Sequence, residues 1–134
     1  MQFSLLSIAA LATTAAAGGI NCNGSGYCKI NPGASLQMVH DQVGNLIAAG
    51  GGDRHFNGGE NIACSHGSMG SVCAFYQNGA SGSAKDAYKQ LQDLMNHGCK
   101  LCGSIPTQPG NDVSKGELTV NYVTNPGCEG DCHV

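Results

Sequence analysis

The chain of 134 residues has few aromatic and charged side chains. It contains no tryptophan, its aromatics amount to 5% and its charged residues to 11%. Six basic residues face nine acidic ones, and nothing resembles the basic stripe that follows a phosphate backbone, so nucleic acid is not expected as a partner. A core with so few aromatics and 21 glycines is modest, and we expect it to need covalent support.

Catalytic signatures are missing as well. The sequence has no G-x-S-x-G, no H-E-x-x-H and no phosphate loop with its lysine and serine or threonine. His97 lies at the end of a predicted helix, where histidine more often satisfies terminal carbonyls than acts as a base. The adjacent His40 and Asp41 are interpreted as solvated side chains, because neighbouring helix residues point in different directions. We therefore predict a protein that is not an enzyme and holds neither metal nor cofactor.

Long apolar stretches are confined to the beginning of the chain. Residues 1–17 carry no charged side chain, and the apolar run at 3–12 is too short to span a membrane. Three alanines before Gly18 offer a small-residue cleavage site. We expect residues 1–17 to be a signal peptide and residues 18–134 to form one secreted, extracellular domain that is not embedded in a membrane. A buried apolar helix is the other interpretation of the run, and it fits these criteria less well.

Cysteine, in contrast, is abundant. All eight cysteines lie in the expected mature part, and an even number in a small exported chain predicts a disulfide framework. Spacing alone does not choose their connectivity. The Cys99-x-x-Cys102 spacing would also suit zinc or a redox dithiol. An oxidising compartment argues against zinc, and the lack of a thioredoxin-like βαβ pattern argues against the dithiol.

Apolar periodicity predicts two helices. The first follows Ser83, a suitable N-cap, and ends near Gly98, and its apolar positions recur at helical spacing. The second is predicted from Ser35 to about Ala49. Gly44 lies in its middle and lowers helix stability by about 1 kcal/mol relative to alanine.

Alternating apolar residues predict three strands. Residues 60–66 and 71–78 form a hairpin around the loop 67–70, and residues 116–124 form a half-buried strand. An edge strand is expected near residues 20–22. The tail from Cys128 is expected to be stapled by disulfides and not packed.

Two loops carry candidate surface features. Residues 50–59 are rich in glycine and hold Arg54 and His55, so a mobile recognition loop is expected there. Asn23-Gly24-Ser25 is an N-glycosylation sequon, which makes Asn23 a possible modification site, although Asn-Gly is equally a turn signal.

Three runs of this sequence resemble a known family. They are GINCNGSGYC at 19–28, NHGCKLCGS at 96–104 and GNDVSKGELTVNYV at 110–123. Together and in this order, they resemble the virally encoded killer toxins of smut fungi, the KP-four killer toxin family. The resemblance implies an α+β, disulfide-stapled sandwich in which an antiparallel sheet of about five strands carries two main helices on one face.

The resemblance also implies a disulfide pattern. It suggests the pairs Cys22–Cys99 and Cys28–Cys102, which tie the N-terminal segment to the end of the main helix. The family toxin links its equivalent of Cys64 to its C-terminal cysteine, which implies Cys64–Cys128 and leaves Cys73–Cys132. The exchange of these last two partners stays open.

The function implied by the resemblance is growth inhibition without catalysis. Such toxins block calcium entry into susceptible cells, so a target-cell surface protein, possibly a calcium channel, is the expected partner of a monomeric toxin. Candidate contacts are Arg54, His55, Lys100 and Lys115. The family's basic run before the equivalent of Cys64 reads Glu-Asn-Ile-Ala at 60–63 here. The alternatives are a small secreted hydrolase and a non-toxic cell-wall or host-interaction module.

Overall fold

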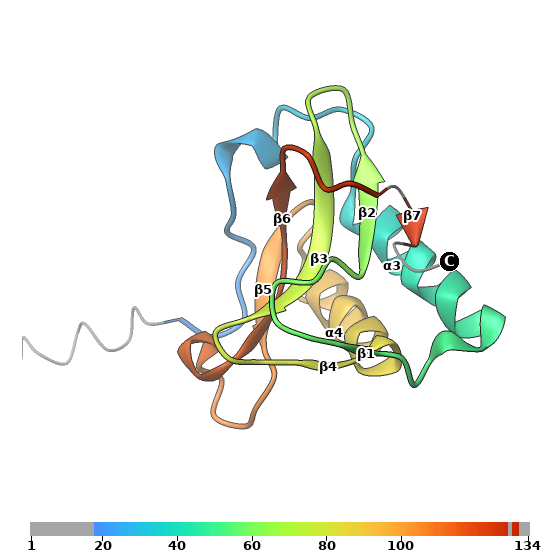
Figure 1. The fold of residues 1–134 in the computed structure, drawn as a ribbon. Helices are drawn as coiled ribbons and strands as arrows, with labels where there is room; N and C mark the ends of the chain where they lie inside the picture. Colours follow the sequence, from blue (N-terminus) through green and yellow to red (C-terminus); the bar gives the residue numbers. More distant parts are fainter. Residues whose placement is uncertain (1–17, 129, 132–134) are drawn as a thin grey trace, which may run out of the picture.

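A sheet of five antiparallel strands carries two helices on one face (Figure 1). The computed structural model describes residues 18–128 and 130–131, so the expected signal peptide lies outside the described residues. The helices and strands are α3 (Leu36–Leu46), α4 (Ala84–Asn96), β1 (His55–Phe56), β2 (Ala63–His66), β3 (Ser71–Gln77), β4 (Gly82–Ser83), β5 (Gly103–Pro106), β6 (Glu117–Val123) and β7 (Gly130–Asp131). Short helical turns form η1 (Gly26–Cys28), η2 (Ile47–Gly51) and η3 (Val113–Lys115).

The strand order in the large sheet is β5-β6-β3-β2-β7, and each neighbouring pair is antiparallel. Helix α3 packs against β2 and β7, and α4 packs against β5 and against α3. Strands β1 and β4 form a separate small ladder just before α4. Three disulfides staple these elements. This architecture confirms the predicted α+β class with both helices on one face.

Helix α4 begins and ends where the sequence predicts. The hydroxyl of Ser83 accepts a hydrogen bond from the Asp86 N–H at 3.1 Å, which satisfies a free donor of the first turn. Gly98 follows the helix with φ 107°, a left-handed conformation that glycine adopts without steric cost. The apolar stripe of the helix is buried, at Ala84, Ala87, Leu91 and Leu94.

Helix α3 runs through Gly44 without a break. The hydroxyl of Ser35 caps its first turn by accepting from the Met38 N–H at 3.1 Å. A Cβ at Gly44 would lie only 3.1 Å from the ring of Tyr88, so glycine allows α3 and α4 to approach closely here. The regular helix ends at Leu46, three residues before the predicted end, and the chain continues as the π-helical turn η2.

The predicted hairpin forms, with the Gly67 N–H donating to the Gly70 carbonyl at 2.7 Å. Strand β6 differs from the half-buried prediction, because Glu117 and Thr119 on its other face are buried too. The Gln77 side-chain amide donates to the carboxylate of Glu117 and to the hydroxyl of Thr119, at 3.1 and 2.9 Å. Hydrogen bonding between neighbouring strands therefore makes burial of this polar face tolerable.

Three expectations about the sheet edges need correction. Strand β5 is missing from the strands that the sequence predicts. The predicted edge strand near residues 20–22 is reduced to a single bridge between Asn21 and Ser104. The tail expected to be unpacked contributes β7, which pairs with β2 at Ala63 and Cys64. Two-residue pairings of this kind carry no periodic sequence signal and depend on tertiary position.

Candidate functional site

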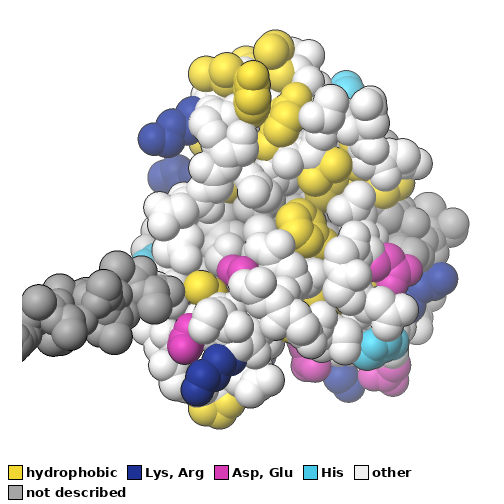
Figure 2. All heavy atoms as spheres, turned by 60° about the vertical axis from the view of Figure 1, so that its left-hand side comes forward, with side chains coloured by type: hydrophobic (Ala, Val, Ile, Leu, Met, Phe, Trp, Pro, Cys, Tyr) yellow, Lys and Arg dark blue, Asp and Glu magenta, His cyan; other side chains and the backbone are white. Residues whose placement is uncertain are grey.

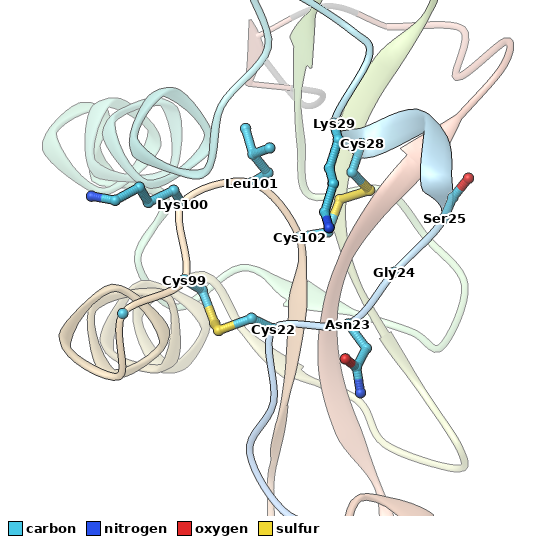
Figure 3. Close-up of a pocket in the computed structure, with 11 residues that line it drawn as sticks. Cys22, Asn23, Gly24, Ser25, Cys28, Lys29, Cys99, Lys100, Leu101 and Cys102 are labelled. Atoms are coloured by element: carbon cyan, nitrogen blue, oxygen red, sulfur yellow. A yellow bond between two sulfur atoms is a disulfide. The ribbon is translucent and has the colours of Figure 1, made fainter.

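Two disulfides tie the N-terminal segment to the end of α4 and frame a surface hollow of about 380 Å³ (Figure 3). The bridges are Cys22–Cys99 and Cys28–Cys102, with Cα atoms 5.2 and 6.3 Å apart. Both are the pairs that the resemblance implies. The hollow is therefore a product of the fold's covalent framework, and its walls come from two segments more than 70 residues apart in the sequence.

Close backbone approach shapes the walls of the hollow. A Cβ at Gly24 would lie 2.7 Å from the Cβ of Cys102, and one at Gly103 would lie 2.5 Å from the Asn21 carbonyl oxygen. The Leu36 N–H donates to the Lys100 carbonyl at 3.1 Å and fixes the other side against α3. Glycine at both positions lets the N-terminal segment lie flat against the start of β5.

Two lysines line this hollow, Lys29 and Lys100. Figure 3 shows Lys29 reaching across the Cys28–Cys102 bridge, whereas the end of Lys100 points away from the hollow. Within the described part of the chain, neither ammonium group has an ion-pair partner. Lys85 and Lys89, in contrast, pair with Asp53 and Asp93 at 3.0 and 3.5 Å. Lys29 thus gives the hollow a positive charge that no described carboxylate compensates.

The third bridge corrects the predicted disulfide pattern. Cys64 is bonded to Cys73, so both Cys64–Cys128 and Cys73–Cys132 are wrong, and so is the exchanged pair Cys64–Cys132. The hairpin register places residues 64 and 73 directly opposite each other, with Cα atoms 4.1 Å apart. Cys128 is nevertheless close, because its Sγ lies 3.7 Å from that of Cys64. Cys132 lies outside the described residues.

The structure separates the four predicted contact residues. Arg54 and His55 are exposed beside the start of α4, where the Ala84 N–H donates to the Arg54 carbonyl at 3.0 Å. Lys100 follows the other end of α4, and a helix of 13 residues is about 20 Å long. Lys115 is exposed on η3, a third place. A single surface built from all four does not exist in this structure.

Hydrogen bonds hold charged side chains next to two of the candidate contacts, Lys115 and Arg54. The Ser114 hydroxyl and N–H both donate to Asp112, at 2.6 and 2.9 Å, and lower the pKa of that carboxyl group. The hydrogen bond to Asp53 raises the pKa of Lys85, which keeps this lysine charged and engaged near Arg54. The charges of Asp112 and Lys85 are thus stabilised by partners within the molecule.

His40 and Asp41 were interpreted as solvated, and for His40 this is wrong. Its ring is buried and stacks on the ring of Tyr88 in α4, with centroids 4.2 Å apart. Its Nδ1 lies 3.4 Å from the carboxylate of the exposed Asp41, and its Nε2 is buried without a partner among the described residues. Position 40 faces α4 because the interface extends beyond the apolar stripe, which periodicity alone did not indicate.

All described cysteines are in disulfides. Within residues 18–128 and 130–131, no group of three or more histidine, cysteine, aspartate or glutamate side chains is arranged to hold a metal ion. His97 occupies the C-cap position of α4 and is exposed. In the same part of the chain, no helix combines the length and apolar character needed to span a bilayer.

Asn23, the possible glycosylation site, is exposed at the rim of the hollow (Figure 3). Its side chain points away from the hollow, so a glycan there would leave the hollow open. Ser25 caps η1 by accepting from the Tyr27 N–H at 3.1 Å. Modification of Asn23 stays a prediction.

Sequence reasoning missed Lys29. The signal was available, because the pairs Cys22–Cys99 and Cys28–Cys102 bring Lys29 and Lys100 to the same hollow. Lys29 directly follows Cys28, and Lys100 lies between Cys99 and Cys102, which belong to the two different bridges. Once the disulfide pattern is known, it predicts that the two lysines lie near each other.

Comparison with known proteins identifies relatives of this chain. The model of the Kp4 family matches residues 5–124. The KP4 killer toxin of Ustilago maydis P4 virus is 39% identical over 126 residues, which cover 92% of this chain and 94% of that toxin. The residues matched by the family model therefore span the four cysteines of the bridges that frame the hollow, both helices and the strands up to β6.

Proposed function

Because the chain belongs to the Kp4 family, we propose that it is a secreted killer toxin that inhibits susceptible cells by blocking their calcium uptake through a channel. The observation that carries this proposal is the identity to the viral killer toxin along nearly the whole chain. A disulfide-stapled domain of this size suits an extracellular role, since its bridges persist under oxidising conditions.

Positive charge is the expected means of engaging a cation channel. Channel entrances that select cations present acidic side chains, which attract exposed ammonium or guanidinium groups. Strand β2 is preceded here by Glu60, Asn61 and the buried Ile62, which provide no cation. The candidate contacts are therefore Arg54 with His55 beside α4, Lys100 at the hollow, and Lys115 on η3.

Growth inhibition in the presence and absence of added calcium tests the proposal. The purified, oxidised protein should inhibit sensitive fungal or plant cells, and added calcium should relieve the inhibition. Killing that calcium does not relieve would contradict the channel mechanism, and absence of inhibition would contradict the toxin.

Single substitutions locate the contact surface. Because the candidate residues lie apart, Arg54→Ala, Lys100→Ala and Lys115→Ala each test one place. Lys89→Ala is the matched control, since Lys89 already pairs with Asp93 and is not a candidate contact. Full activity of Arg54→Ala would remove the loop at 50–59 from the mechanism.

Two alternatives have different readouts. A hydrolase would turn over polysaccharide or RNA, and His97→Ala would abolish that turnover. A non-toxic wall-binding or host-interaction module would bind cells without slowing their growth. If calcium uptake is unchanged, turnover would favour the hydrolase over the proposed toxin, and binding without slower growth would favour the non-toxic module.

A further inference from the structure

An exposed apolar cluster lies at one end of the molecule, next to the hollow. Tyr27, Ile30 and Met69 are 51%, 56% and 52% exposed, and they are three of the four most exposed large hydrophobic side chains that the structure describes. The half-buried Tyr122 lies beside them. We call these four residues the apolar tip. Figure 2 shows hydrophobic side chains projecting at this edge of the molecule, with basic side chains nearby.

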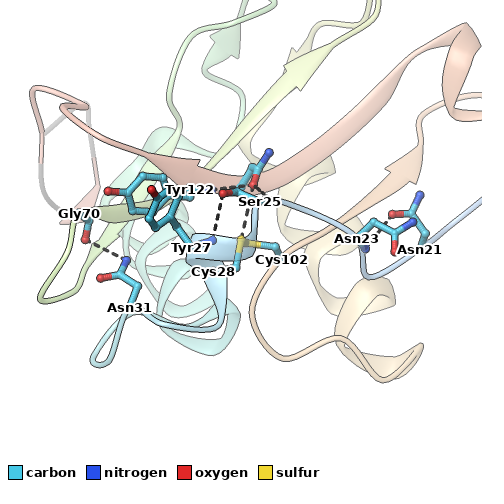
Figure 4. Close-up of a disulfide and its surroundings, with 10 residues drawn as sticks. Asn21, Asn23, Ser25, Tyr27, Cys28, Asn31, Gly70, Cys102 and Tyr122 are labelled. Atoms are coloured by element: carbon cyan, nitrogen blue, oxygen red, sulfur yellow. Dashed lines mark hydrogen bonds between the residues drawn. A yellow bond between two sulfur atoms is a disulfide. The ribbon is translucent and has the colours of Figure 1, made fainter.

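The apolar tip is held in place by specific contacts. The rings of Tyr27 and Tyr122 lie against each other with centroids 5.0 Å apart (Figure 4). The Tyr122 hydroxyl donates to the Met69 carbonyl at 2.9 Å. The Asn31 carbonyl oxygen accepts from the Met69 N–H at 2.8 Å, and its amide donates to the Gly70 carbonyl at 3.1 Å. Three separate segments are thus locked together with their apolar side chains facing outward, an arrangement that usually marks an interaction site.

The charge around the apolar tip is positive although the whole chain has a formal charge of −3. Lys29 lies between Tyr27 and Ile30 in the sequence, and Lys100 lines the same hollow as Lys29. Neither lysine has an ion-pair partner among the described residues. The segments that supply the tip and both lysines contain no aspartate or glutamate at all: residues 18–40, 61–85, 94–111 and 118–128.

We infer that the apolar tip with Lys29 docks on the anionic phospholipid surface of a membrane. Tyrosine rings and flanking lysines are the side chains that settle at the headgroup level, where their apolar parts are buried and their polar ends stay hydrated. Ile30 and Met69 supply the part that enters the acyl boundary. Lys29 supplies attraction to lipid phosphate and carboxylate groups.

The shape of the surface favours lipid over a protein partner. A stable protein interface buries about 800 Å² on each side, usually with well-packed pockets at its centre. The residues of the tip instead come from the turn η1 and the loop after it, the β2–β3 hairpin loop and the end of β6, which Figure 1 shows as separate segments. A few projecting apolar side chains next to a lysine suit a fluid surface that needs no complementary shape.

Vesicle binding tests this inference directly. The full, oxidised chain should sediment with vesicles of phosphatidylcholine mixed with phosphatidylserine more than with phosphatidylcholine alone, and salt should weaken the difference. Ile30→Ser and Met69→Ser should lower the partition coefficient about tenfold. Lys29→Gln should lower it about fivefold, and only on the anionic vesicles.

Matched controls separate the tip from general surface effects. Met38→Ser removes the fourth exposed large hydrophobic side chain, which lies on α3, and Lys89→Gln removes a cation on α4. Both should bind like the wild type. Wild-type protein that ignores both vesicle types, or equal losses in Met38→Ser and Met69→Ser, would overturn the inference. Binding to whole target cells but not to lipid would point to a protein receptor and would overturn it too.

The inference rests on the proposed action at a cell surface, but its test does not. Vesicle binding without growth inhibition would refute the toxin function and leave the lipid-docking surface. Calcium-relieved killing without vesicle binding would refute lipid docking and leave the toxin function.

Discussion

Asp112 is the residue whose charge state is most clearly tied to local structure. Its carboxylate accepts two hydrogen bonds from Ser114, which hold its pKa below the ordinary value and cap η3. A lowered pKa in the folded state adds stability above the unfolded pKa of about 4, and that stability is lost as the pH falls through the folded value.

Asp112→Asn should therefore remove the loss of unfolding free energy that Asp112 causes as the pH falls below about 4. The variant should be less stable than the wild type above about pH 4, and the difference should shrink at lower pH. Urea unfolding at a series of pH values measures it. Ser114→Ala removes the hydroxyl donor and keeps the N–H donor, so it should show the same trend with a smaller size. A difference that persists unchanged in acid would contradict this explanation.

His40 packs its ring between α3 and α4, and we expect this packing to stabilise the fold. Its ring stacks on Tyr88, while its buried Nε2 has no partner among the described residues. Phenylalanine retains an aromatic ring and removes the unsatisfied atom, whereas alanine leaves a cavity between α3 and α4.

We expect His40→Ala to lower the free energy of unfolding by about 2 kcal/mol, and His40→Phe to leave it within about 1 kcal/mol of the wild type. Chemical denaturation at neutral pH compares the two. If the phenylalanine variant were the less stable one, the imidazole would have a polar role that the structure does not reveal.

At the scale of elements, helix α4 is organised by its N-cap. The Ser83 hydroxyl accepts from the Asp86 N–H, and its backbone carbonyl accepts from the hydroxyl of Tyr76. Ser83→Ala removes only the first of these bonds and should cost about 1 kcal/mol. Thermal unfolding measures the loss, and Ser81→Ala, two residues away in the preceding turn, serves as the control. Equal stability of both variants would show that the cap is dispensable.

Elements with strong local signals could be predicted from the sequence. Helix α4 has a periodic stripe, a cap and a terminal glycine, and the β2–β3 hairpin has alternation and a glycine-bounded loop. Strands β5 and β7 could not be predicted, because short edge pairings are determined by where the rest of the sheet lies.

The candidate site was predictable only in part. Its two bridges agree with the family resemblance, but the Cys64–Cys73 bridge depends on strand register, which places these residues opposite each other. The apolar tip could not be found from sequence, since Tyr27 and Met69 lie far apart in the chain and show no shared pattern.

For the whole molecule, the long-range bridges should dominate stability. The Cys22–Cys99 and Cys28–Cys102 bridges join residues 77 and 74 positions apart, whereas Cys64 and Cys73 are separated by nine. In the chain-entropy model, each long loop contributes roughly 4–5 kcal/mol and the short one about 2.5 kcal/mol.

Replacing both cysteines of a bridge by serine should reveal this order. Cys28→Ser with Cys102→Ser should destabilise the protein more than Cys64→Ser with Cys73→Ser, as measured by denaturant unfolding. Non-reducing peptide mapping of the wild type provides the check on connectivity. A Cys64–Cys128 peptide in that map would contradict the hairpin bridge and restore the pairing implied by the family.

The short pairings at both margins of the sheet have a consequence for behaviour in concentrated solution. An open strand edge is a template on which a second chain can add its own strand and start a fibril. Here β7 covers β2, while Asn21 bonds to β5, whose last residue, Pro106, has no N–H to offer. Both edges of the sheet are therefore short, with two residues in β7 and four in β5, and they offer a second chain few free backbone groups on which to start a fibril.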